Sequence, residues 1–151
     1  MALDRQEQIE FLREHYEHPH KRGAAPNANA EVEGGNPGCG DIVRIYLTVD
    51  ADGKTVKDVR FTGEGCTISQ ASASILMELL EEKDEYHTVA GLEEMDFGAL
   101  QEVLGKETVR LRPRCAILSL DTLKATVRKY QREKLMRENG IDPATYGKPA
   151  T

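Results

Sequence analysis

The sequence predicts an α+β fold, in which several helices accompany a small antiparallel β-sheet. Residues 42–49 and 55–61 (IVRIYLTV and TVKDVRF) carry β-branched and aromatic side chains in partial alternation, which is typical of strands. The four residues between them (DADG, 50–53) have the turn chemistry of an antiparallel hairpin. Other segments place apolar residues at the three- and four-residue spacing of amphipathic helices, so the chain combines one hairpin with several helices.

The length, charge and hydropathy of the chain limit what it can be. Its 151 residues suit one compact domain, which we predict over residues 1–138, followed by a flexible polar tail at 139–151. The net charge of −6 argues against nucleic-acid binding and favours a partner with a basic surface. No apolar stretch approaches the length of a membrane span, and the N-terminus is charged where a signal peptide is apolar. We therefore predict a cytoplasmic protein without nucleic-acid or membrane partners.

The N-terminal part of the chain is predicted to form a helix followed by a loop. Residues 4–16 hold apolar side chains among charged ones at helical spacing, and this helix is expected to end before Pro19. Residues 21–38 are rich in Gly, Pro, Asn and Ala and show no periodicity. They are therefore predicted to be an extended loop that leads to Cys39.

Two helices are predicted between the hairpin and the C-terminal third of the chain. Residues 67–82 carry an apolar stripe at helical spacing, and Thr67 or Ser69 can cap the start of this helix. After a charged stretch, residues 95–104 indicate a shorter helix, which Gly105 is placed to stop.

The last long helix is predicted over residues 115–138, beginning just after Pro113, with an apolar face that packs on the sheet. Each cysteine then falls at the junction of a loop and a regular element: Cys39 enters the hairpin, and Cys66 and Cys115 each open a helix. A helix N-terminus presents backbone N–H groups and the positive end of the dipole, which stabilise a thiolate. Three is an odd number of cysteines, they lie far apart in sequence, and a reducing compartment disfavours disulfides, so we expect free thiols or metal ligands.

Charged side chains stand beside two of these cysteines. Arg112 and Arg114 precede Cys115, where their positive charge favours a thiolate. Asp41 follows Cys39 by two residues and offers a carboxylate oxygen. If the three junctions converge, three sulfurs and one carboxylate suffice for a tetrahedral zinc ion or for the terminal ligands of a [2Fe–2S] cluster.

Simpler explanations exist for each of these features. A single cysteine more often packs in a core than binds a metal, and the spacing of these three matches no compact zinc motif. The histidines at 15, 18 and 20 are better explained by a solvated helix end than by a metal cluster. A cysteine hydrolase needs a nearby histidine base, and the only other histidine, His87, lies in a charged stretch. Residue types and spacing therefore leave packing and metal binding both open.

Four segments, taken together, resemble the iron–sulfur cluster scaffold family, which comprises the IscU, SufU and NifU N-terminal-domain proteins. They are, in order, HYEHPHKRG (15–23), NPGCGD (36–41), GEGCTISQASAS (63–74) and RPRCAILSLDTL (112–123). The resemblance runs from about residue 5 to residue 130. It implies an α+β fold with helices packed on one side of a small antiparallel sheet, in agreement with the elements predicted above.

The resemblance also implies a ligand set and partners. The family's ligand positions carry over to Cys39, Asp41, Cys66 and Cys115, which would hold a transient [2Fe–2S] cluster or a zinc ion. Family members receive sulfur as a persulfide from a cysteine desulfurase and pass clusters to apo iron–sulfur proteins, and a homodimer is compatible with the cluster-bound state. Because a carboxylate binds iron less tightly than a thiolate, Asp41 is expected to keep the cluster labile.

Two functions of different classes remain at this stage. The first is a cluster assembly scaffold; the second is a zinc-dependent sulfurtransferase in which Cys115, assisted by Arg112 and Arg114, accepts the persulfide. Arg114 stands where IscU-type proteins have histidine, which favours the second function. The interval between Cys66 and Cys115 is too short to hold all of the insertion of SufU-type proteins, which favours the first function. The chaperone-recognition stretch of IscU-type proteins is replaced by TVRLR at 108–112.

Overall fold

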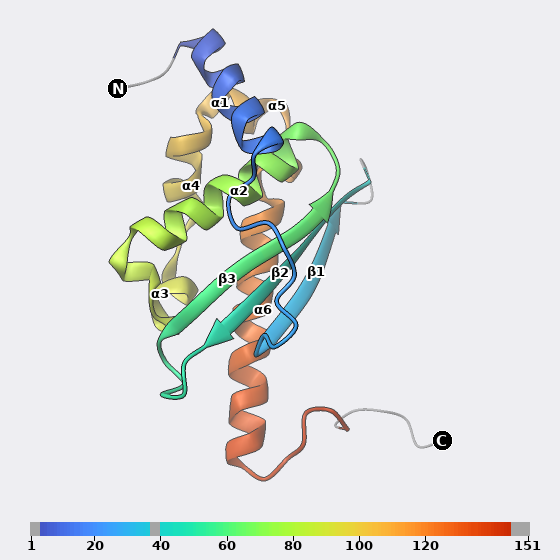
Figure 1. The fold of residues 1–151 in the computed structure, drawn as a ribbon, viewed down its shortest axis with the longest axis vertical. Coiled ribbons are helices and arrows are strands. Elements are labelled where there is room, and N and C mark those ends of the chain that lie inside the picture. The colour runs from blue at the N-terminus through green and yellow to red at the C-terminus, as the bar shows by residue number, and fades with distance from the viewer. Residues whose placement is uncertain (1–3, 37–39, 146–151) are drawn as a thin grey trace.

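Three antiparallel strands form one sheet in the order β1-β2-β3, with β1 at Ala30–Asn36, β2 at Asp41–Val49 and β3 at Val56–Glu64 (Figure 1). The computed structural model describes residues 4–36 and 40–145. The remaining elements are helical: α1 (Arg5–Glu17), α2 (Thr67–Glu82), a short 3-10 helix (Asp84–Tyr86), α3 (Val89–Glu94), α4 (Phe97–Leu104), α5 (Lys106–Leu111) and α6 (Pro113–Glu138). The predicted α+β class and the predicted hairpin are confirmed.

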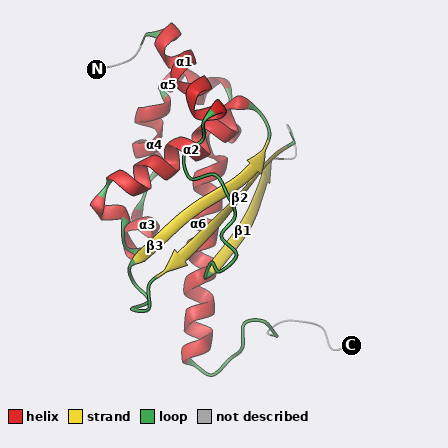
Figure 2. Ribbon diagram, viewed as in Figure 1, coloured by secondary structure: helices red, strands yellow, loops and turns green. Residues whose placement is uncertain are grey.

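The helices lie on one side of the sheet (Figure 2). The long helix α6 packs across β1 and β2, while α2 packs on β3 and against α6, and α1 forms an outer layer on α2. The connection between α1 and β1 runs along the side of the sheet that faces away from α6 (Figure 1). Within the described ranges, no helix combines the length and the apolar character that a bilayer crossing requires.

The alternation of β2 explains why the sheet has one covered face. Val43, Ile45 and Leu47 are fully buried and point toward the helices, whereas Arg44 between them faces the other side and contacts Glu31 and Glu33 of β1. Because successive side chains of a strand point to opposite faces, this pattern turns one apolar face toward α2 and α6. The core between the layers also contains Phe61, Ile75, Leu76, Leu123 and Val127.

Strand β1 corrects the prediction that residues 21–38 form a loop. Its sequence, AEVEGGN, has one β-branched residue and two glycines, so local preference does not identify it as a strand. The strand exists because β2 supplies a full ladder of partners, from Ala30 opposite Leu47 to Asn36 opposite Asp41. A Cβ at Gly34 would collide with the side chain of Thr122, so this glycine lets α6 approach the strand closely.

Helix boundaries show further differences from the sequence prediction. Gly105 ends α4 as predicted, with a φ of +90°, but the chain turns directly into α5, which the sequence analysis did not predict; α3 was also missed. Helix α6 begins at Pro113 itself, since a proline at the first helical position needs no N–H partner. The cap of α2 is Cys66 in place of Thr67 or Ser69, because the Cys66 sulfur accepts the Ser69 N–H at 3.5 Å.

His15 corrects the prediction of a solvated histidine cluster. The residue is 9% exposed at the interface of α1 and α2, where its Nδ1 lies 2.7 Å from the Ser74 hydroxyl oxygen. The same hydroxyl accepts the backbone N–H of His20 at 2.8 Å. Burial lowers the pKa of His15 below its usual value of 6.5, and the Glu78 carboxylate, 3.6 Å from Nε2, only partly offsets this effect.

We expect this buried histidine to make stability fall as pH decreases. The pKa of His15 is lower in the folded state than in the unfolded state, so its contribution is intact above about pH 6.5 and is lost as pH falls toward the folded pKa. The free energy of unfolding, measured in urea at pH 7.5 and pH 5, should therefore decrease more in the wild type than in a His15→Gln variant. An equal decrease in both proteins would contradict this explanation.

Candidate metal centre

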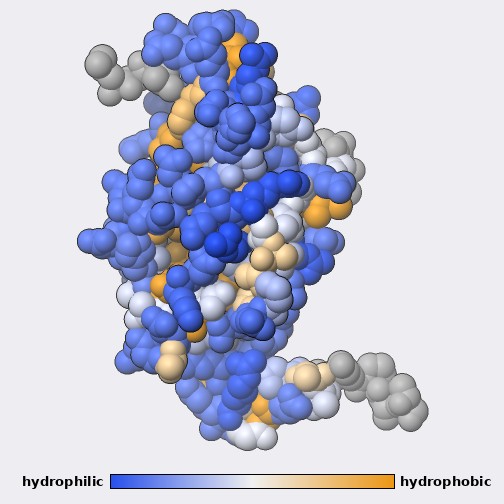
Figure 3. Space-filling view, in the orientation of Figure 1, coloured by the Kyte–Doolittle hydropathy of each residue, from blue (hydrophilic) through white to orange (hydrophobic). Residues whose placement is uncertain are grey.

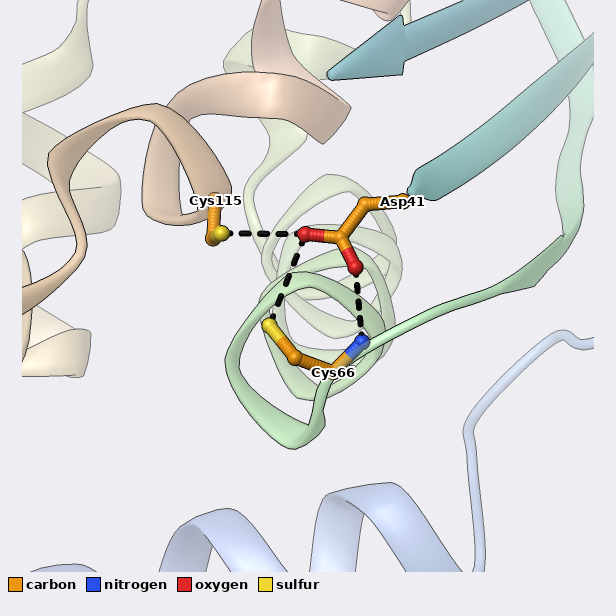
Figure 4. Close-up of side chains that lie close together, drawn as sticks. All are labelled: Asp41, Cys66 and Cys115. Atoms are coloured by element: carbon orange, nitrogen blue, oxygen red, sulfur yellow. Dashed lines mark hydrogen bonds between the residues drawn. The ribbon is translucent and has the colours of Figure 1, made fainter. Parts of the chain in front are cut away.

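Three elements bring Asp41, Cys66 and Cys115 together at one end of the sheet (Figure 4). Asp41 is the first residue of β2, Cys66 is the N-cap of α2, and Cys115 is the third residue of α6. One ligand atom from each residue lies within 4.8 Å of the other two. The fourth predicted ligand, Cys39, lies outside the described residues.

The Asp41 carboxylate is the centre of this arrangement. Its Oδ1 accepts the backbone N–H of Cys66 at 2.7 Å, which fixes the carboxylate against the start of α2. Its Oδ2 accepts hydrogen bonds from the thiols of Cys115 at 2.9 Å and of Cys66 at 3.5 Å. One carboxylate oxygen therefore faces both sulfurs, as Figure 4 shows.

Burial differs among the three side chains. Asp41 is 1% exposed and Cys115 is 2% exposed, whereas Cys66 is partly exposed. A buried carboxylate is costly unless it is paired, hydrogen-bonded or bound to a metal. The site is therefore reached from the side of Cys66, and Cys115 lies behind it.

The donor set fits a metal ion. Neighbouring donors of a tetrahedral zinc ion with sulfur ligands lie about 3.7 Å apart, since the Zn–S bond is about 2.3 Å long. The three ligand atoms here lie within 4.8 Å of one another before any ion draws them together. An ion between them would replace the two thiol protons that now point at Asp41 Oδ2. The three residues supply two soft sulfurs and one hard oxygen, leaving one tetrahedral position for a further donor.

Gly65 allows the chain before α2 to lie against Asp41, a role that the sequence did not predict. Its φ is +144°, and a Cβ at this position would overlap the Asp41 carboxylate and lie 2.9 Å from the Asp41 Cα. Only glycine lets the end of β3 pass this close to the carboxylate. The sequence signal for this role is the glycine directly before Cys66, which alone is equally consistent with a simple tight turn.

Gln70 is a second supporting residue that the sequence analysis missed. Its Nε2 donates to the Ile42 carbonyl oxygen at 3.3 Å, next to Asp41, and to the Ser69 hydroxyl at 3.1 Å. The Ser69 hydroxyl in turn donates to the Cys66 carbonyl oxygen at 3.1 Å. These bonds join the start of β2 to the first turn of α2, so they help to set the distance between Asp41 and Cys66.

The two predicted helper arginines lie on the surface beside the centre. Arg112 is the N-cap residue of α6, and Arg114 lies in its first turn, with Pro113 between them. Both side chains are exposed, next to the buried Cys115. Their assistance to Cys115 stays a prediction.

Comparison with known proteins gives consistent matches over most of the chain. Residues 7–137 match the family model described as the NifU-like N-terminal domain. The zinc-dependent sulfurtransferase SufU of Bacillus subtilis is 33% identical over 136 residues, which cover 81% of this chain and 90% of that protein. The iron-sulfur cluster assembly scaffold protein IscU of Thermotoga maritima is 37% identical over 123 residues, which cover 74% of this chain and 85% of that protein.

Solved structures have the same fold. A protein from Fervidobacterium islandicum, described as an iron-sulfur cluster assembly scaffold for the SUF system, aligns with a TM-score of 0.59 at 29% identity. The alignment covers 78% of this chain and 94% of that protein. The N-terminal part of a nitrogen-fixing NifU-like protein from Brucella abortus aligns with a TM-score of 0.58 at 18% identity, covering 83% of this chain and 99% of the other, which supports the fold alone.

Proposed function

This chain belongs to the NifU-like N-terminal domain family, as its cysteine segments predicted, and on this basis we propose that it is an iron–sulfur cluster assembly scaffold. In this proposal it receives sulfur from a cysteine desulfurase, assembles a transient [2Fe–2S] cluster and passes the cluster to apo-proteins. The ligands are Cys39, Asp41, Cys66 and Cys115. The observation that carries the proposal is the convergence of one carboxylate and two thiols from three separate elements.

The geometry suggests how these residues act on iron and sulfide, which are the cargo. Asp41 Oδ2 accepts hydrogen bonds from both thiols, so it is placed to take up a proton when a thiol becomes a thiolate ligand. This proton must pass to solvent before the same oxygen can bind iron. The Cys66 N–H keeps the carboxylate in position during this exchange. Since a carboxylate is a weaker ligand for iron than a thiolate, Asp41 provides the bond that opens first when the cluster leaves.

A second candidate function is zinc-dependent sulfur transfer. Two observations favour it: the chain is 33% identical in sequence to a protein described as a zinc-dependent sulfurtransferase, and Arg112 and Arg114 are exposed next to Cys115. In this reaction the Cys115 thiolate attacks the terminal sulfur of the desulfurase persulfide, forms a new S–S bond and releases the desulfurase thiolate. Because Cys115 is 2% exposed, the centre must open before the attack, and zinc would keep the other ligands ordered.

Anaerobic reconstitution tests both functions. The protein is incubated with ferrous iron, cysteine, a cysteine desulfurase and dithiothreitol, which reduces the persulfide sulfur to sulfide. Visible absorbance is followed, and transfer to an apo-ferredoxin is then measured. We expect a coloured species with two irons and two sulfides that transfers, and we expect Cys66→Ser and Cys115→Ser variants to form none. A colourless protein that retains one zinc ion and accelerates desulfurase turnover would replace the scaffold proposal with sulfur transfer.

A further inference from the structure

The C-terminal part of α6 differs in charge from the rest of the chain. Residues 124–138 contain six basic and two acidic side chains, although the whole chain has a net charge of −6. In Figure 1 the last turns of α6 extend past the end of the sheet, at the opposite end of the helix from its first turn, whereas Val127 and Tyr130 are still buried against the core. The segment is therefore a basic region on an acidic protein.

Most basic side chains of this segment have contacts within the molecule. The ammonium groups of Lys124, Lys129 and Lys134 donate to the backbone carbonyl oxygens of Glu93, Glu31 and Gly53, respectively. A guanidinium nitrogen of Arg137 lies 3.6 Å from Glu133. These four residues therefore contribute to the attachment and charge balance of the helix itself.

Arg128 and Arg132 differ from these four residues in their contacts. Both are exposed, and within residues 4–36 and 40–145 neither forms an ion pair or a side-chain hydrogen bond. They are four positions apart, so their like charges are neighbours on one helix face, an arrangement that disfavours the isolated helix. Leu135 follows at the same face with 61% of its surface exposed.

We propose that Arg128, Arg132 and Leu135, which we call the terminal stripe, form a docking surface for an acidic protein partner. Arginines beside an exposed apolar side chain match the composition of protein interfaces, in which arginine is enriched. Figure 3 shows apolar atoms among hydrophilic ones at this projecting end of the molecule. An acidic partner is repelled by most of this chain and attracted by the stripe, so charge also orients the encounter.

The position of the stripe separates this partner from the metal centre. Helix α6 rises about 1.5 Å per residue, so the stripe begins about 20 Å from Cys115 along one continuous helix. A protein bound there leaves the approach to Cys66 open. The surface therefore suits a partner that is held while a second protein works at the cysteines.

The test measures binding to a folded acidic protein and does not depend on cluster assembly. An acidic plant-type ferredoxin is titrated against the metal-free chain by fluorescence anisotropy at low and at physiological salt. We expect the wild type to bind, with an affinity that falls as salt rises. An Arg128→Glu/Arg132→Glu variant should bind with an affinity at least about tenfold lower. A Leu135→Ser variant should bind more weakly with the same salt dependence.

A charge-matched control uses two other exposed arginines, in the Arg5→Glu/Arg13→Glu variant on α1. This variant changes the net charge by the same amount and should keep wild-type affinity. The proposal is overturned if the wild type does not bind the ferredoxin, if reversal of the stripe has no effect, or if both double variants lose affinity equally. Wild-type binding to phosphatidylserine vesicles or to a short DNA duplex, without binding to the ferredoxin, would also overturn it.

Discussion

An Asp41→Cys variant is expected to hold its assembled cluster about tenfold longer than the wild type. The substitution puts a thiolate where the carboxylate now faces the sulfurs of Cys66 and Cys115, and thiolates bind iron more tightly than carboxylates do. The lifetime is measured from the decay of visible absorbance in the presence of an iron chelator. Transfer to an apo-ferredoxin should slow to a similar degree.

Ser119→Cys is the matched control for this experiment. Ser119 is fully buried on α6, one turn after Cys115, so the control also adds a fourth cysteine to the protein but not at the Asp41 position. Its cluster should decay at the wild-type rate. A cluster on the Asp41→Cys variant that is lost as fast as the wild-type cluster, or faster, would show that the carboxylate is not the source of lability.

A Gly65→Ala variant is expected to lose metal affinity by at least about tenfold and to lower the free energy of unfolding by about 1–3 kcal/mol. The added methyl group would overlap the Asp41 carboxylate, so either the strand end or the start of α2 must shift. The N–H of Cys66 would then no longer align with Oδ1. Zinc affinity is measured by competition with a chromophoric chelator, and stability by urea unfolding.

Gly23→Ala separates backbone strain from collision in this test. Gly23 has a φ of +152°, similar to that of Gly65, but a Cβ there would meet only a guanidinium nitrogen of Arg60 at 4.0 Å. The control should lose some stability and keep its zinc affinity. If both variants lose affinity to the same extent, the close approach of Gly65 to Asp41 is not what holds the centre.

Much of the fold follows from local signals in the sequence. The alternation of residues 42–49, the turn at 50–53 and the stripes of α2 and α6 are local patterns, and all of these elements are present where the sequence predicts them. Strand β1 is not predictable in this way, because AEVEGGN has little strand preference and pairs only through the ladder that β2 offers. His15 shows the same limit, since its burial depends on α2 packing over α1.

The candidate site also has features that the sequence predicts and features that depend on the tertiary structure. The sequence by itself determined the residue types and their placement at junctions, and its motifs identified the family, because these properties depend on local order along the chain. Only the tertiary structure decided that Asp41, Cys66 and Cys115 meet, that one carboxylate oxygen serves both thiols, and that Gly65 allows this approach. The reason is that these relations depend on how strand ends and helix ends are packed together, and that packing joins residues that are far apart in sequence.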